Sequence, residues 1–193
     1  MSHLEIYLKS SAQVIEDTIT HLASEKVEEV IKVVVENLKQ KRPLLVCGNG
    51  GSAADAMHIA GELVARFKLD RPGLNVISLN DNMSTLTAWS NDCSYDTVFA
   101  RQVDAYGKNG GVLLGISTSG NSKNIIEAFK IAKNMGVQTV AMTGKDGGKL
   151  ADMADYLIDV PSKNTALIQQ VHICLYHYMC EQIEIAFSTA DLF

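Results

Sequence analysis

The sequence predicts a doubly wound α/β fold, in which a five-stranded parallel sheet carries helices on both faces behind an N-terminal helical hairpin. Apolar residues recur at helical spacing over residues 3–40 and then gather in five short continuous runs. Most runs lead into a Gly-, Asn- or Ser-rich loop and a helical stretch. Continuous apolar strands that alternate with helices are typical of a parallel sheet buried on both sides. The length of 193 residues fits one domain, with an arm at 1–40 and a core at 41–193.

The arm contains two amphipathic helical patterns. Their apolar positions are Leu4, Leu8, Ala12, Ile15 and Ile19 in the first, and Val27, Val30, Ile31, Val34 and Leu38 in the second. Steps of three and four residues place each set on one helix face. The predicted strands follow at Leu44–Cys47, Leu74–Leu79, Val112–Ile116, Val137–Met142 and Tyr156–Val160. A last helix is expected at roughly 164–187.

Composition argues against two classes of partner. The net charge of -5 comes without a basic cluster, which disfavours a nucleic-acid partner. No apolar run approaches the roughly 20 residues of a membrane span, and the N-terminal stretch MSHLEIYLKSSAQ lacks the layout of a secretory signal. The four cysteines form no CxxC pair and are expected to be buried, reduced thiols of a cytoplasmic protein. They are Cys47, Cys93, Cys174 and Cys180.

A glycine-rich loop follows the first predicted strand, in the stretch VCGNGGSAADAM. Glycines at 48, 50 and 51 would let backbone N–H groups at a helix start approach an anion or a polyol. The spacing of Gly48, Gly50 and Ala53 also fits a loose dinucleotide fingerprint, with Asp81 as a possible ribose ligand. The third alternative is a plain turn that needs positive φ.

A second loop, STSGNS at 117–122, favours a bound phosphate over a dinucleotide or a plain turn. Four hydroxyl side chains and a glycine at a helix start bring side-chain donors, backbone N–H groups and the helix dipole together. There is no GK[ST] sequence, so the loop is not a Walker-type nucleotide site. The simpler alternative is an N-cap, for which one hydroxyl suffices.

The helix that starts near Ser52 carries Asp55, His58, Glu62 and Arg66 on one face. A solvated polar face would account for this pattern, and the His–Glu spacing of four would also suit a metal pair. The opposing apolar stripe is predicted to contain Ala53, Met57, Ala60, Val64 and Phe67.

The final helix carries polar side chains in an otherwise apolar segment. Gln169 and His177 lie within about 80° on the helical wheel, whereas His172 lies about 140° from His177. His177 can therefore act with Gln169, and His172 is expected to be a satisfied core or interface residue.

Several motifs occur in order and with family-like spacing over about residues 44–185. They are CGNGGSAADAMHIAGEL, LTAWSNDCSYDTVFARQV, LLGISTSGNSKNI, TGKDGGKLADMAD and the spacing of the IQ pair to the histidine of the last helix. In these motifs the sequence resembles the phosphoheptose isomerases, a group of the sugar isomerase (SIS) domain proteins. The resemblance implies a single SIS domain that converts sedoheptulose 7-phosphate to D-glycero-D-manno-heptose 7-phosphate through an enediol. This reaction is the first step toward the nucleotide-activated heptose of lipopolysaccharide or capsule.

The resemblance also implies the site residues. Glu62 and His177 match the catalytic pair, and His58, Glu62, Gln169 and His177 match a zinc site. The substrate-binding matches are Asn49, Gly50, Gly51, Ser52, Glu62, Asn91, Asp92, Ser117, Thr118, Ser119, Ser122 and Gln169. A homotetramer with active sites between subunits is expected. Leu167 stands where the family pattern has an Arg and Gln170 where it often has a Glu, which puts subunit contacts or substrate preference in doubt.

Two alternatives remain open from the sequence. One is a SIS-domain regulator that binds another protein and has lost catalysis, as replication-initiator-associated relatives do. The presence of both Glu62 and His177 argues against it. The other is a dinucleotide-dependent enzyme, which a nucleotide-binding test would detect.

Overall fold

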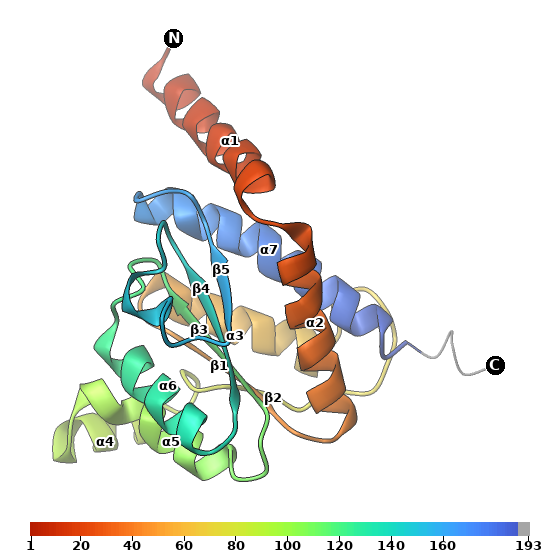
Figure 1. Ribbon diagram of the computed structural model, residues 1–193, viewed down its shortest axis with the longest axis vertical. Helices are drawn as coiled ribbons and strands as arrows, with labels where there is room; N and C mark the ends of the chain where they lie inside the picture. Colours follow the sequence, from red (N-terminus) through yellow and green to blue (C-terminus); the bar gives the residue numbers. More distant parts are fainter. Residues whose placement is uncertain (189–193) are drawn as a thin grey trace.

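The computed structural model describes residues 1–188 and contains one parallel sheet of five strands in the order β2-β1-β3-β4-β5 (Figure 1). The strands are β1 Leu44–Gly48, β2 Val76–Ser78, β3 Val112–Ser117, β4 Gln138–Thr143 and β5 Tyr156–Asp159. All pairs are parallel, which confirms the predicted doubly wound sheet. β2 is shorter than predicted. Beyond it, Leu79 N–H still bonds Val46 O at 2.8 Å, and the Asn80 side chain then bonds both N–H and C=O of Gly48.

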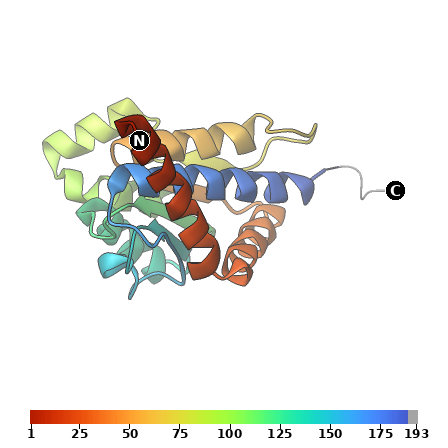
Figure 2. The ribbon, with the colours of Figure 1, turned by 90° about the horizontal axis from the view of Figure 1, so that it is seen from above.

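Helices cover both faces of this sheet (Figure 2). They are α1 His3–His21, α2 Ser24–Lys39, α3 Gly51–Val64, α4 Met83–Asp92, α5 Val98–Tyr106, α6 Lys123–Asn134 and α7 Thr165–Ile185, with short 3₁₀ turns η1 Tyr95–Thr97 and η2 Gly148–Leu150. The packing of buried side chains puts α2, α3 and α7 on one face and α5 and α6 on the other. In β1, Leu44 and Val46 face the first group, and Leu45 and Cys47 face the second. The strand is therefore apolar throughout, because both of its faces are buried.

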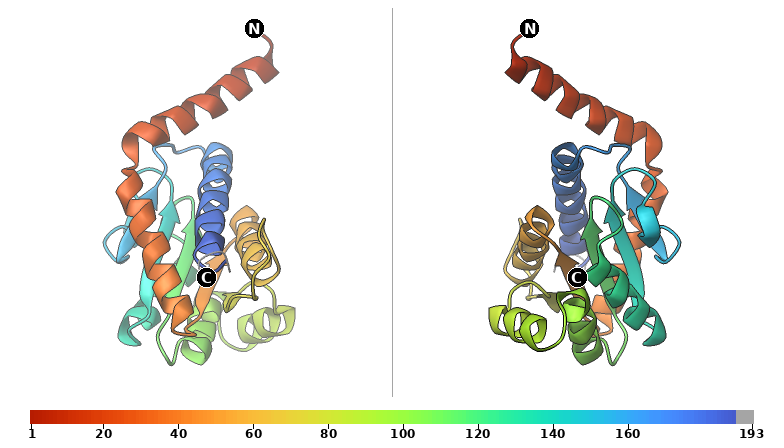
Figure 3. Two further views of the ribbon diagram at one scale, coloured as in Figure 1. Left: turned by 90° about the vertical axis from the view of Figure 1, so that its right-hand side faces the viewer. Right: turned by 90° about the vertical axis from the view of Figure 1, so that its left-hand side faces the viewer.

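The predicted arm helices are present, and they have different surroundings. α2 packs its stripe into the core through residues such as Val30 and Val34. α1 begins with a capping box of Ser2 and Glu5 and leads away from the body of the molecule (Figure 3). Its last residue, His21, contacts Asp159 at the end of β5 at 2.8 Å.

Two predictions about burial are wrong. α3 buries Ala56, Ile59, Ala60 and Leu63, whereas Met57 and Val64 of the predicted stripe are exposed. The helix has to pack on the sheet and on α7, and these neighbours select a face about one residue away from the predicted one. Among the four cysteines, Cys47 and Cys180 are buried, whereas Cys93 at the end of α4 and Cys174 on α7 are exposed.

The predicted domain runs to residue 193, and residues 189–193 lie outside the described part of the chain. The prediction of a single domain with an arm at 1–40 stays a prediction. None of the helices within residues 1–188 has the length and apolar character required to cross a bilayer.

Candidate active site

The glycine loop lies where β1 and β3 end side by side, with Gly48 paired to Ile116. The chain order of the sheet reverses between these two strands, which is where ligands bind in open α/β sheets. Gly50 has φ +57° and is the N-cap of α3, and no side chain caps that helix. A Cβ at Gly50 would meet no atom within 4 Å. The N–H groups of Ser52, Ala53 and Ala54 already bond the carbonyls of Asn49 and Gly50, so the open space beside Gly50 is the feature that would admit an anion or polyol.

The STSGNS loop sits at the end of β3 and leads into α6. Ser122 is the N-cap of α6, but its hydroxyl caps no N–H and instead pairs with Ser117 Oγ at 2.9 Å. Ser119 is exposed. Gly120 has φ +63°, and a Cβ there would collide with the carbonyl of Gly147. The loop is thus tightly fixed against the 144–148 turn, and its hydroxyls are not used as the simple N-cap that the sequence left possible.

Asn49 is held by two residues that sequence reasoning missed. Its amide pairs reciprocally with Asn124 at the start of α6, at 2.9 and 2.8 Å, and its Oδ1 also accepts the Tyr95 hydroxyl at 2.8 Å. These contacts join the glycine loop to the STSGNS loop and to the η1 turn. Asn124, two residues after the STSGNS loop, was the only signal in the sequence for the contact between the two loops.

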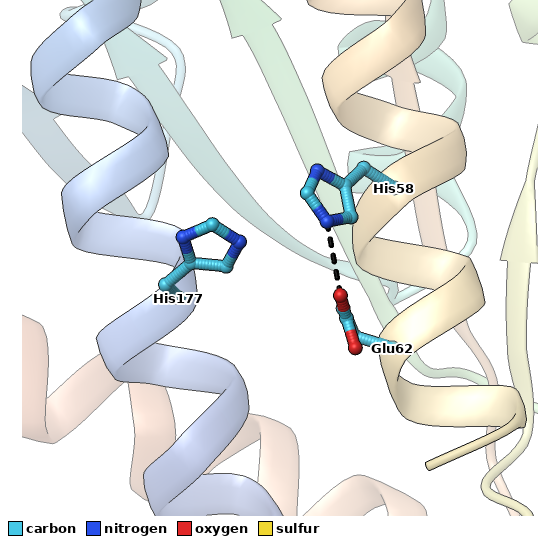
Figure 4. Close-up of side chains that lie close together, drawn as sticks. All are labelled: His58, Glu62 and His177. Carbon is cyan, nitrogen blue, oxygen red and sulfur yellow. Dashed lines mark hydrogen bonds and ion pairs between the residues drawn. The ribbon is translucent and has the colours of Figure 1, made fainter. Parts of the chain in front are cut away.

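The second part of the site is a cluster of His58, Glu62 and His177 (Figure 4). One ligand atom from each lies within 4.8 Å of the others. His58 Nε2 is 2.9 Å from Glu62 Oε1 on α3, and the His177 ring on α7 meets the His58 ring edge-on with centroids 5.0 Å apart. The structure therefore brings together residues that are more than 110 positions apart in the sequence.

The loop that follows α3 packs against this cluster and is held in place by α7. Phe67 stacks on His177 with ring centroids 5.7 Å apart and an interplanar angle of 15°. Buried Glu184 on α7 accepts the N–H groups of Phe67, Lys68 and Leu69 at 2.9, 2.6 and 2.9 Å. Arg71 also donates to the carbonyl of Glu62 at 2.8 Å. The last turn of α7 thus holds both the end of α3 and the aromatic ring on His177.

Gln169 lies apart from this cluster. Its amide packs against Gly51, where a Cβ would be 2.6 Å from Nε2. Gln169 precedes His177 by eight residues on α7, which is about 12 Å along a helix. Within one chain, three of the four expected zinc ligands come together, and the fourth lies at the glycine loop.

The other sequence-predicted residues have varied surroundings. Ser52 is buried in the first turn of α3, and exposed Asn91 bonds exposed Asp92 at 2.8 Å at the end of α4. Leu167 is buried, and Gln170 donates to the Tyr7 hydroxyl of α1 at 3.2 Å. His172 is fully buried, which confirms a core position, but only its Nε2 has a hydrogen-bond partner within residues 1–188, so the predicted satisfied state is half met.

The donor set of the cluster fits a divalent metal. Two imidazoles and a carboxylate are ligands that Zn²⁺ accepts, and three protein ligands leave a fourth position for water or substrate. His58 and Glu62 remain partly exposed, so this position is reachable from solvent.

Known proteins match the chain along most of its length. Residues 6–144 match the SIS domain family. A phosphoheptose isomerase from Crocosphaera subtropica is 52% identical over 157 residues, which is 81% of this chain and 80% of that protein. The solved phosphoheptose isomerase from Neisseria gonorrhoeae has a TM-score of 0.88 and 40% identity, covering 94% of this chain and 97% of its own. The one from Francisella tularensis has a TM-score of 0.90 and 34% identity, covering 96% and 100%. The chain therefore belongs to the SIS-domain family and to the group of its members named phosphoheptose isomerases.

Proposed function

We propose that the protein is an aldose–ketose isomerase of the cytoplasm that converts D-sedoheptulose 7-phosphate to D-glycero-D-manno-heptose 7-phosphate. The product would supply heptose for a surface polysaccharide. The observation that carries the proposal is the convergence of His58, Glu62 and His177, in a chain whose relatives are named for this activity. A SIS-domain protein that only binds a partner would not need these three groups together.

The reaction moves a proton between C1 and C2 and needs a base, an acid and a fixed phosphate. The carboxylate of Glu62 is the base for the carbon-bound proton, and His177 is the group that exchanges protons with the O1 and O2 oxygens. The STSGNS loop holds the phosphate with hydroxyls and free N–H groups, as its uncapped helix start supports. Phe67 keeps the His177 ring in one orientation.

We also propose that the cluster binds zinc through His58, Glu62 and His177. Bound zinc would polarise the sugar carbonyl as a Lewis acid. Metal analysis after purification without chelators is expected to find zinc. Protein that contains none, and whose activity does not respond to added zinc, would show metal-free acid–base chemistry.

The protein is proposed to act as a homotetramer with active sites between subunits. The separation of Gln169 from the cluster within one chain supports this, because a Gln169 that also bound the metal would have to come from a second copy. The exposed apolar face of α1 supports it independently.

The activity is tested by incubating the protein with sedoheptulose 7-phosphate and following the aldose 7-phosphate by NMR. Glu62→Gln keeps the shape and removes the base, so kcat is expected to fall by about 10²–10⁴, the usual contribution of general acid–base catalysis. Glu181→Gln, an exposed change on α7, serves as the matched control. Wild-type turnover in Glu62→Gln would assign the base to another residue, and no aldose from the wild type would reject the proposed substrate.

A further inference from the structure

His58 is hydrogen-bonded through both of its ring nitrogens. Nε2 faces Glu62 in the cluster, and Nδ1 lies 2.9 Å from the hydroxyl oxygen of Tyr176. Tyr176 comes from α7, directly before His177, and only 1% of its surface is exposed. The Nδ1 side of the ring therefore points into the protein, toward a phenol that neither the sequence motifs nor the proposed reaction use.

The chain of contacts continues to Asp55. Its Oδ1 lies 3.4 Å from the Tyr176 hydroxyl, and it precedes His58 by three residues on α3. Asp55 is 8% exposed, and its Oδ2 has no hydrogen-bond partner within residues 1–188. A buried carboxylate with an unpaired oxygen is costly. Phenylalanine and alanine could occupy these places without that cost, so packing alone does not account for the pair.

The direction of the hydrogen bonds follows from the donor count. A phenol has a single proton and can donate only one hydrogen bond. The phenol O–H donates to Asp55 Oδ1. The phenol oxygen is then free to accept a proton from Nδ1 of His58. In this arrangement Nδ1 is committed to the phenol, and Nε2, 2.9 Å from Glu62 Oε1, is the ring nitrogen left for a cation in the cluster.

We propose that Tyr176 and Asp55 are positioning residues that hold the His58 ring with its proton on Nδ1, so that Nε2 is presented to a cation bound with Glu62 and His177. The inference rests on the proposed zinc site in that Nε2 is taken as the metal-binding atom. Histidine ligands commonly donate the N–H of their second ring nitrogen to an oxygen acceptor, and loss of that acceptor costs about 10–100-fold in metal affinity.

The test is zinc affinity, measured on chelator-stripped full-length protein by competition with a chromophoric zinc indicator. Tyr176→Phe keeps the ring and removes the hydroxyl, and it is expected to weaken zinc binding about 10–100-fold. Tyr178→Phe is the matched control, because its hydroxyl lies two residues further on α7 and bonds Glu28 instead. Asp55→Asn alone is expected to weaken zinc binding. Combined with Tyr176→Phe it should weaken zinc binding little beyond Tyr176→Phe alone, since Asp55 acts through the phenol.

A second measurement separates positioning from general destabilisation. In the zinc-loaded wild type, ¹H–¹⁵N NMR is expected to show a slowly exchanging His58 Nδ1–H proton, which should be lost in Tyr176→Phe and kept in Tyr178→Phe. Unchanged zinc affinity and an unchanged Nδ1–H signal in Tyr176→Phe would overturn the inference. So would additive effects of the two substitutions. A wild type that isomerises the sugar phosphate but binds no zinc would overturn it while leaving the proposed activity intact.

Discussion

His172 and His177 are five residues apart on α7 and meet opposite surroundings. His177 faces the cluster with His58 and Glu62. His172 is fully buried, its Nε2 donates to the carbonyl of Thr143 at 3.0 Å, and its Nδ1 has no partner within residues 1–188. Burial lowers the pKa of His172 to about 4, despite the opposing effect of the backbone hydrogen bond. The imidazole is thus a neutral core group.

This burial predicts a pH dependence of stability. In the unfolded chain His172 takes up a proton near its ordinary pKa of about 6.5, whereas the folded protein resists protonation down to about 4. The contribution of His172 to the free energy of unfolding is complete above pH ~6.5, and it falls by about 3 kcal/mol as the pH drops to about 4. Urea unfolding against pH should show a flatter profile for His172→Gln than for wild type. His3→Gln, at an exposed position, is the control. Equal pH slopes for wild type and His172→Gln would contradict the assignment.

At the scale of elements, two uncapped helix starts, of α3 and α6, face the same edge of the sheet. Replacing both Ser119 and Ser122 by alanine is expected to raise KM for the sugar phosphate at least about tenfold, because one hydrogen bond to a charged group contributes about 1.5–3 kcal/mol. kcat should change less, since the chemistry lies on α3 and α7. Ser188→Ala, three residues past the end of α7, is the control in steady-state kinetics. An unchanged KM would place the phosphate elsewhere.

The end of α7 is an anchor for the loop after α3. Burial raises the pKa of Glu184, but three backbone N–H donors and Arg71, 3.4 Å away, bring it below the usual range. The stability that the Glu184 carboxylate contributes is therefore present above the ordinary carboxyl pKa, and it is lost as the pH falls through the lowered pKa.

Glu184→Gln tests this anchor by denaturant unfolding at neutral pH. The change removes the charge and sets an NH₂ group among N–H donors, so a loss of about 3–5 kcal/mol is expected, as for other broken buried pairs. Glu181 lies on α7 like Glu184, but its ion pair with Lys68 is exposed. Glu181→Gln should therefore lower the free energy of unfolding by less than about 1 kcal/mol. If the two variants unfolded at the same denaturant concentration, Glu184 would not anchor the loop.

At the scale of the whole molecule, α1 exposes an apolar face that the described chain leaves uncovered. Ile19 is 76% exposed, Leu4 66% and Leu8 57%. Next to this face, a groove of about 290 Å³ lies between α1, α2 and α7, lined by apolar residues such as Leu22, Val27 and Leu175. An apolar face and an apolar groove of this kind are typical of a subunit interface.

Light scattering is expected to give close to four times the chain mass of 21.0 kDa. Leu8→Glu combined with Ile19→Glu should lower this mass, since charged side chains would be buried in the interface. Both positions are exposed within one chain, so the fold should persist. Lys9→Glu, on the same helix, is the control. A wild type of 21.0 kDa at micromolar concentration would refute the tetramer.

The sequence by itself determined the fold class, because strands buried on both faces need continuous apolar runs and helices need steps of three and four. It also predicted two ligand-binding loops from glycines and hydroxyls at helix starts, which stays a prediction, and the pairing of Glu62 with His177 followed from the family resemblance. Tertiary structure decided what periodicity cannot specify. Which face of α3 is buried depends on the position of α7, and the prediction of Met57 in the stripe was wrong for that reason. The contact of Tyr176 with Asp55 joins residues 121 positions apart, and only the packing of α7 beside α3 brings them together.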